Sequence, residues 1–160
     1  MSNLKLRVGL ISARGLAAAD KTGFSDPYAV ARVNGKKYTT KVIKQTLDPI
    51  WDYAFEIPIQ QGKLPTLISI AVWDKDTFGR DFLGEISIPV KNMFDRNNGG
   101  FSDGVPRHYA DPANQAAWFT LNKRSEKNNV SGEIQIKFGF MEQHVRDYQQ
   151  YLDAWQQLIN

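Results

Sequence analysis

Short segments in which apolar and polar residues alternate recur along most of this chain. Between Leu4 and Ile11, leucine or valine occupies every second position. A period of two is typical of β-strands with one buried face, because successive side chains point to opposite faces of a sheet. Eight short strands at these spacings indicate an antiparallel β-sandwich and an all-β fold. The predicted strands are residues 4–11, 27–33, 36–44, 51–58, 66–73, 82–89, 118–121 and 132–140.

Two parts of the chain depart from this pattern. Residues 91–117 are rich in asparagine, glycine and proline, which predicts a long loop, with one short helical turn near 90–94. From Met141 onward, apolar residues recur by threes and fours, which indicates an amphipathic helix. The predicted apolar stripe is Met141, Val145, Tyr148, Leu152, Trp155 and Ile159. We expect a sandwich at 1–140, with 91–117 as a loop insertion, and a helical tail at 141–160.

Composition narrows the classes of function. A length of 160 residues is enough for one domain with a sizeable core. The absence of cysteine excludes disulfides, thiolate metal sites and a cysteine nucleophile, and it fits a reducing compartment. Lys5, Arg7 and Arg14 interrupt the N-terminal apolar residues, so no signal peptide is predicted. No apolar run approaches the roughly 20 residues that a membrane-spanning helix needs.

Five aspartates concentrate in two stretches that follow predicted strands. Asp74, Asp76 and Asp81 lie within eight residues, and Asp20 and Asp26 belong to an upstream loop. Clustered carboxylates repel one another, and a bound cation would offset that repulsion. Calcium is the natural candidate, because it accepts roughly 6–8 oxygen ligands in flexible geometry. With a net charge of +3, such an acidic site leaves a more basic remainder that suits an anionic partner.

The sequence resembles the C2 domain, a calcium- and phospholipid-binding module. The resemblance covers roughly residues 4–139, except for the loop at 91–117. The matching motifs are L-x-V-x-L-I-S-A-R-G-L, D-x-x-G-x-S-D-P-Y-A, T-K-V-I-K-Q-T-L-D-P-I-W-D-Y-x-F, V-W-D-K-D-x-F-G-R-D-F-L-G and S-G-E-I-Q-I. The resemblance implies an eight-stranded antiparallel Greek-key sandwich. Since the G-E-I-Q-I strand comes last, it implies the family's second, circularly permuted topology.

The resemblance also implies a set of calcium ligands. In the family, two aspartates of the first loop and three of the third hold two or three calcium ions. The corresponding residues are Asp20, Asp26, Asp74, Asp76 and Asp81. The third loop is one residue shorter here than in many members, between Asp76 and Asp81, which could weaken or remove one of the ion sites.

Membrane contact is the expected role of the loop tips. Phe24 and Phe78 stand where the family inserts side chains into lipid, and Lys21 and Arg80 are placed to meet lipid phosphates. The plainer interpretation is that the aromatic rings fold back onto the sandwich and that the cations are solvated. An isolated exposed aromatic residue needs no functional explanation.

A second lipid site is implied by the strand region that follows the first loop. In the family this region can form a phosphoinositide-binding patch. The matching residues are Tyr28, Lys37, Lys41 and Trp73. Val30 and Thr39 stand where members with the strongest version carry lysine, so the patch is incomplete. The alternative is that these lysines form an ordinary solvated face.

The expected function is calcium-dependent binding to anionic phospholipid membranes. The domain would act from the cytoplasm as a peripheral targeting module for phosphatidylserine and, through the patch, phosphoinositides. No nucleophile and base lie together near Asp74 and Asp76, so an enzyme is not expected, although the chain could target a larger enzyme. The alternative is a protein-interaction module, in which the helix at 141–160 contacts a protein partner or a following domain and calcium is structural or absent. Nucleic-acid binding is not expected.

Overall fold

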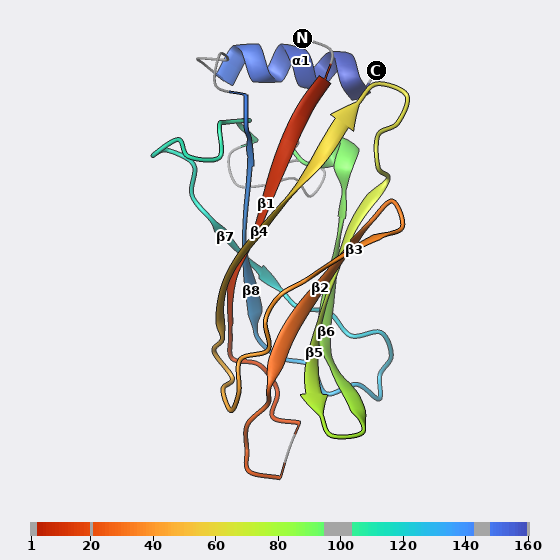
Figure 1. The fold of residues 1–160 in the computed structure, drawn as a ribbon, viewed down its shortest axis with the longest axis vertical. Coiled ribbons are helices and arrows are strands. Elements are labelled where there is room, and N and C mark those ends of the chain that lie inside the picture. Colours follow the sequence, from red (N-terminus) through yellow and green to blue (C-terminus); the bar gives the residue numbers. More distant parts are fainter. Residues whose placement is uncertain (1–2, 20, 95–103, 143–147, 160) are drawn as a thin grey trace.

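The computed structural model describes residues 3–19, 21–94, 104–142 and 148–159 as two antiparallel four-stranded sheets packed face to face (Figure 1). The first sheet has the order β4-β1-β8-β7, and the second has the order β3-β2-β5-β6. The predicted all-β sandwich is confirmed. The strands are β1 (Asn3–Arg14), β2 (Pro27–Val33), β3 (Lys36–Thr39), β4 (Ile50–Gln60), β5 (Leu67–Asp76), β6 (Gly79–Pro89), β7 (Ala117–Thr120) and β8 (Glu133–Phe140).

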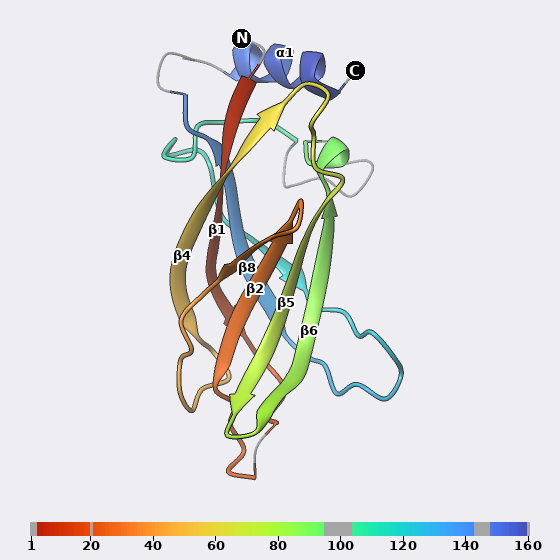
Figure 2. The same ribbon diagram turned by 45° about the vertical axis from the view of Figure 1, so that its right-hand side comes forward.

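The strand connections form the predicted permuted Greek-key arrangement. The last strand, β8, lies between β1 and β7 and pairs antiparallel with both. The chain crosses between the sheets after β1, β3, β4 and β6, whereas β2-β3 and β5-β6 are neighbours within one sheet. As a result, the loop between β1 and β2, the loop between β3 and β4 and the β5-β6 hairpin meet at one end of the sandwich (Figures 1 and 2).

The core contains the apolar residues that the alternation predicts. Leu6, Val8 and Leu10 on β1 have no exposed surface, and Ile68 and Val72 on β5 are equally buried. Their polar neighbours along each strand face outward, because the pleat turns successive side chains to opposite faces. The period of two therefore assigned both faces of these strands correctly.

The predicted strand at 36–44 is too long, because sheet pairing ends at Thr39. Thr40 explains the early end. Its hydroxyl accepts a hydrogen bond from the amide of Ala29 at 2.9 Å, and its own amide donates to the Ala29 carbonyl at 3.0 Å. A side-chain bond therefore replaces a bond of the ladder, and residues 40–49 continue as an irregular loop.

The β5-β6 hairpin is tighter than expected. Asp76 pairs directly with Gly79, so only Thr77 and Phe78 form the turn. The strands therefore carry the aspartates themselves, and they hold these side chains more firmly than a long loop would.

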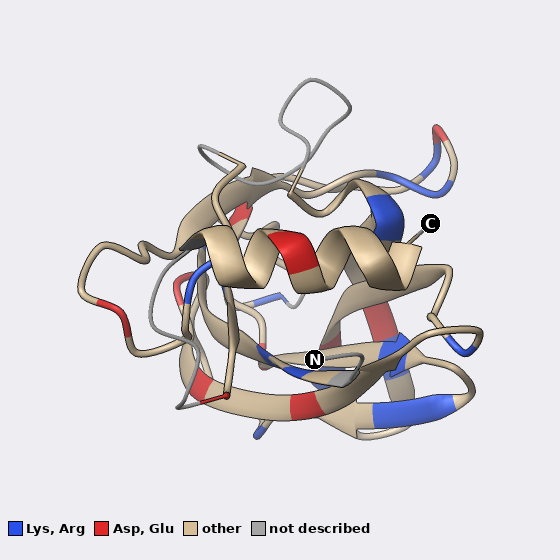
Figure 3. Ribbon diagram, turned by 90° about the horizontal axis from the view of Figure 1, so that it is seen from above, with Lys and Arg blue, Asp and Glu red and all other residues tan. Residues whose placement is uncertain are grey.

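The C-terminal helix, α1 (Tyr148–Ile159), lies across the end of the sandwich opposite this hairpin (Figures 1 and 2). Viewed from that end, it lies over the sandwich with Asp153 as its one charged residue (Figure 3). Its ring contacts reach the sandwich core, with the Trp155 ring 5.2 Å from Phe94 and the Tyr151 ring stacked 4.9 Å from Phe140. Sandwich and helix thus share one core.

The buried face of α1 differs from the predicted stripe. The buried residues are Tyr151, Ala154, Trp155 and Leu158, whereas Leu152, Ile159 and Met141 are only partly buried. Val145 and the side chain of Tyr148 lie outside the described residues. The apolar pattern alone was compatible with burial of either of two neighbouring faces of α1. The face that is buried is the one that contacts Phe94 and Phe140.

Tyr151 anchors the start of α1. Its hydroxyl donates to the carbonyl oxygen of Glu142 at 2.8 Å. Burial, with the nearby Glu142 and Asp111 charges, raises the pKa of Tyr151 to about 12, so this hydroxyl stays protonated and able to donate.

The long loop after β6 begins with the predicted helical turn, seen as a 3₁₀-helix at Val90–Asn92. Residues 95–103 lie outside the described part of the chain. Further on, Tyr109 packs onto the outer face of the first sheet, where a side chain on Gly9 or Gly139 would collide with it. The Tyr109 ring also contacts Arg7 and Lys137, with the cations 5.0 and 4.6 Å from its centroid. The end of this loop is therefore attached to the sheet.

Replacing Trp155 with alanine should destabilise the whole domain, because the side chain is 1% exposed in the shared core. We expect the free energy of unfolding to fall by about 3–5 kcal/mol, measured by urea denaturation. The matched control is Gln156→Ala, an exposed neighbour, which should change stability by about 0.5 kcal/mol or less. Equal stability of the two variants would contradict the shared core.

Candidate metal and membrane site

Asp74 is the most deeply placed of the predicted ligands. It occupies the inward-facing position after Val72 on β5, directly opposite Pro27 of β2, and is only 3% exposed. One of its carboxylate oxygens accepts a hydrogen bond from the amide of Asp26 at 2.6 Å. A buried carboxylate is costly unless it is hydrogen-bonded or paired, so this bond helps to hold it in place. The same bond connects the loop between β1 and β2, which carries Asp26, to the β5-β6 hairpin, which carries Asp74.

Asp26 and Asp76 are fixed by backbone amides as well. Asp26 accepts from the Gln45 amide at 2.8 Å, and Asp76 accepts from the Phe78 amide at 2.9 Å. Asp26, Asp74 and Asp76 line one open depression of about 450 Å³. The other residues that line it are Val42, Lys44, Lys75 and Thr77. Three of the predicted ligands, from two distant loops, therefore come together.

Asp81 and Asp20 differ from these three. Asp81 lies directly opposite Asp74 on β6, so both side chains point to the same side of the sheet, but Asp81 is exposed and does not line the depression. Asp20 lies outside the described residues.

The donor set fits calcium by its chemistry, because it consists of carboxylate oxygens, the hard ligands that this ion takes. In the described part of the chain, no three carboxylate or imidazole groups converge closely enough to hold a metal ion. Like charges repel at short range, and each of Asp26, Asp74 and Asp76 bonds to a backbone amide.

Both predicted lipid-inserting aromatics lie at this end of the molecule. Phe78, at the tip of the hairpin, is 98% exposed, and Phe24 is 45% exposed. A phenylalanine with almost its whole side chain in water is unusual, because burial of an aromatic ring is strongly favourable. Lys21 is exposed beside the first loop tip. Arg80 does not extend from the tip, since its guanidinium lies 3.7 Å from the centroid of the Trp73 ring.

The residues of the implied phosphoinositide patch lie on or near the outer face of the second sheet. Tyr28 and Trp73 are direct cross-strand partners on β2 and β5. Lys37 of β3 lies opposite Arg32, while Lys41 follows the end of β3 in the irregular segment. The two neutral residues that make the patch incomplete, Val30 and Thr39, face each other between them.

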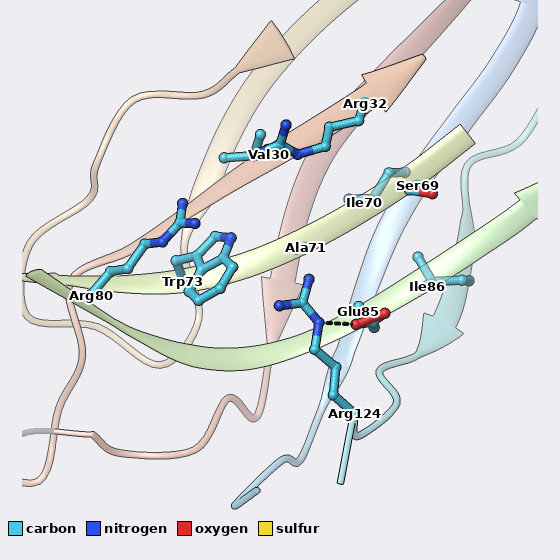
Figure 4. A pocket seen from close by; sticks show the side chains of 10 residues that line it. All are labelled: Val30, Arg32, Ser69, Ile70, Ala71, Trp73, Arg80, Glu85, Ile86 and Arg124. Carbon is cyan, nitrogen blue, oxygen red and sulfur yellow. Dashed lines mark hydrogen bonds and ion pairs between the residues drawn. The ribbon is translucent and has the colours of Figure 1, made fainter. Parts of the chain in front are cut away.

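Two arginines near Trp73, Arg32 and Arg124, were not predicted from the sequence as functional residues. Arg32, Arg80 and Arg124 line a cleft of about 180 Å³ on this outer face (Figure 4). Arg32 could have been found, because the period of two places it on the same face as Tyr28. Arg124 gave no such signal, since it lies on the loop between β7 and β8 and reaches Trp73 only in the folded chain.

Comparison with known proteins identifies the fold family. The family model described as C2 domain matches residues 4–103, well over half of the chain. The chain belongs to the C2 domain family. As a C2 domain it is a binding module of a family that binds phospholipid membranes. None of the helices in the described residues is long and apolar enough to cross a bilayer.

Relatives of this C2 domain include two plant proteins. A C2 and GRAM domain-containing protein of Arabidopsis thaliana is 30% identical over 142 residues, which cover 88% of this chain and 12% of that protein. Synaptotagmin-5 of Arabidopsis thaliana is 27% identical over 142 residues, which cover 88% of this chain and 21% of that protein. The chain therefore spans only a small part of these relatives.

Solved structures support the fold. The first C2 domain of plant extended synaptotagmin 1 has a TM-score of 0.65 at 19% identity, covering 86% of this chain and 94% of that chain. The calcium-bound tandem C2 domains, A and B, of extended-synaptotagmin 2 give a TM-score of 0.63 at 23% identity, covering 86% of this chain and 45% of that chain. At these identities the likeness concerns the fold.

Proposed function

We propose that this C2 domain binds anionic phospholipid membranes in response to calcium. The observation that carries the proposal is the depression shared by Asp26, Asp74 and Asp76, next to the fully exposed Phe78. An acidic, oxygen-lined hollow beside an apolar tip combines a place for a cation with a side chain suited to lipid. It is the two features side by side, rather than either one alone, that support the proposal.

Calcium would change the sign of the charge at this end of the domain. Asp26, Asp74 and Asp76, with Asp20 and Asp81, would hold two or three ions through carboxylate oxygens. Without calcium these carboxylates outnumber Lys44 and Lys75 and repel anionic lipid. Two ions would add four positive charges, and a bound cation dominates the electrostatics of such a site. Lipid oxygens could then complete the coordination, which would couple calcium affinity to membrane binding.

Once electrostatic attraction has brought the calcium-loaded end to the anionic membrane, Phe24 and Phe78 would anchor the domain in the bilayer. Transfer of their rings from water to the acyl region contributes roughly 25 cal/mol for each Å² of apolar surface buried. Lys21 and other cations near an anionic leaflet each add roughly 1 kcal/mol. The outer-face residues Tyr28, Lys37, Lys41 and Trp73 would add contacts to phosphoinositide headgroups.

Cytoplasmic membrane targeting within a longer protein is the role that we propose. One of the similar solved structures is described as calcium bound, and curated relatives that include a synaptotagmin are much longer than this chain. We propose no catalytic role for the domain itself. The alternative, protein binding through the C-terminal helix, has less support, because Tyr151, Trp155 and Leu158 are buried in the shared core.

Neutralising two exposed ligands should weaken the calcium response. In Asp76→Asn with Asp81→Asn, we expect the calcium concentration for half-maximal sedimentation with phosphatidylserine liposomes to rise about tenfold or more, because two charged ligands are lost. The matched control is Asp153→Asn on α1, at the opposite end, which should bind like the unmodified domain. Unchanged calcium dependence in the double variant would refute the proposed site.

Removing the aromatic ring at the hairpin tip should weaken lipid binding without affecting folding. Phe78→Ala should lower the partition into calcium-loaded phosphatidylserine liposomes by about tenfold or more, since burial of one phenylalanine is worth about 1.5–3 kcal/mol. Its thermal unfolding should stay the same, because the side chain is 98% exposed. The control is Leu67→Ala, an exposed apolar residue (41%) at the far end of β5. If both variants partition equally, the hairpin tip does not insert.

A further inference from the structure

We propose that a groove between the edge strands β3 and β4 binds a segment of a protein partner in which acidic residues flank one large apolar side chain. β3 and β4 are edge strands of different sheets, and the stacked rings of Tyr38 and Phe55, 4.2 Å apart, show that the two edges lie side by side. Tyr38 also lines the groove, which has a volume of about 180 Å³. This edge groove shares no residue with the calcium depression or with the implied phosphoinositide patch.

The apolar lining of the edge groove comes from both sheets. Its members are Val33, Tyr38, Ile57, Pro58 and Pro65. Val33 of β2 and Ile57 of β4 are only 3% and 2% exposed, so the groove reaches side chains of the core. An engineered apolar cavity of about 150 Å³ binds benzene, so one aromatic or branched aliphatic side chain fits a groove of this size. The two proline rings fix the backbone around them, which lowers the entropy cost of binding.

A partner is expected to enter the groove with a side chain rather than to pair with an edge strand. Pro58 lies within β4 and has no N–H group, so it interrupts the row of donors that an added strand would need. β3 has only four residues, which is short for pairing with another chain. A side chain inserted between the two edges needs neither row of backbone groups.

Two tight turns place a lysine on each side of the groove. Lys36 follows the two-residue turn of the β2-β3 hairpin, in which Gly35 has a φ of 77°. The amide of Lys63 donates to the Gln60 carbonyl at 3.1 Å, which closes a second turn with Gly62 at a φ of 79°. Glycine favours these left-handed conformations, because it has no Cβ atom. Both lysines line the groove, and the turns fix the backbone that carries them.

The charge of the groove is positive and unbalanced. Lys36 and Lys63 are exposed, neither forms an ion pair with another described residue, and no acidic residue is among those described that line the groove. Lys36 lies directly opposite the buried Val33, so it points to the inner side of its sheet. Such an inward charge can serve only to keep edges from associating. That role does not explain Lys63, which lies beyond the end of β4.

Charge complementarity therefore defines the occupant. An apolar hollow with a cation on each side matches an apolar side chain that has carboxylates before and after it. Protein interfaces commonly have this anatomy, in which one anchor side chain fills a desolvated pocket and polar groups form the rim.

The position of the groove favours a protein over a lipid. In Figures 1 and 2 the β2-β3 turn and the connection from β4 to β5 point toward the end that carries α1, away from the β5-β6 hairpin. A domain that docks through Phe78 would keep the groove away from the bilayer. The inference rests on the proposed function only in this choice between protein and lipid.

The test begins with a library of random twelve-residue peptides displayed on phage and selected against the whole domain in chelator. We expect the enriched peptides to carry aspartate or glutamate on both sides of one aliphatic or aromatic residue. The most enriched peptide is then synthesised with a fluorescent label, and its binding is measured by fluorescence anisotropy. Replacing its apolar residue with alanine should raise the dissociation constant about tenfold or more, because the anchor is lost.

Charge exchange tests the two lysines. Lys36→Glu with Lys63→Glu should raise the dissociation constant of this peptide about tenfold or more, because attraction becomes repulsion on both sides of the groove. A peptide with lysine in place of its acidic residues should recover binding to this variant. The matched control is Lys123→Glu with Lys127→Glu, which changes the net charge equally on the exposed loop between β7 and β8. It should change binding less than twofold, and thermal unfolding should be the same in both variants.

Each outcome decides for or against the groove. Acid-flanked apolar peptides, a loss confined to the groove variant and recovery by charge exchange support it. Enrichment of no such peptides, or equal loss in the two double variants, would overturn it. If phosphatidylserine vesicles in chelator displace the peptide, the groove contacts lipid and the assignment to a protein partner is wrong. Since no step uses calcium, the calcium response of liposome binding can fail or succeed separately.

Discussion

The register of β5 between β2 and β6 is the constraint on which the proposed calcium and phosphoinositide sites both depend. Pleating sends Val72 and Asp74 inward and Trp73 outward. A slip by one residue would expose the apolar core and also exchange the acidic and aromatic side chains between the faces. The buried Ile68, Ile70 and Val72 therefore fix the chemistry of each face while they stabilise the sheet.

The two ends of the sandwich differ in how their aromatic residues are packed. At one end α1 closes the core, and the rings of Trp155 and Tyr151 pack against Phe94 and Phe140. At the other end Phe78, at the tip of the β5-β6 hairpin, is 98% exposed. Because α1 packs at the end opposite the hairpin tip, a substitution of Phe78 leaves this part of the core unchanged. This separation explains why Phe78 can be almost completely exposed.

Charge is divided between faces more strongly than the net value of +3 suggests. Asp26, Asp74 and Asp76 line the depression at the loop end, while arginines surround Trp73 on the outer face of the same sheet. Two neighbouring residues of one strand, Trp73 and Asp74, therefore belong to environments of opposite sign. The calcium and lipid contacts that we propose would use these two adjacent regions of opposite charge.

Residue patterns predicted the strands and the existence of the helix, and the resemblance of local motifs indicated the C2 family, because period-two alternation, helical spacing and motifs are short-range properties. The resemblance implies that Asp26, Asp74 and Asp76 belong to one ligand set. In the structure all three line one depression, although no three carboxylates of the described residues converge closely enough to hold a metal ion. The end of β3, the buried face of α1 and the contact of Arg124 with Trp73 became known only from the folded chain. These features depend on partners distant in the chain: Ala29 bonds to Thr40, Phe94 and Phe140 receive the helix, and the ring of Trp73 meets a loop about fifty residues away. A local pattern shows which side chains can be buried or charged, but packing decides which of them meet.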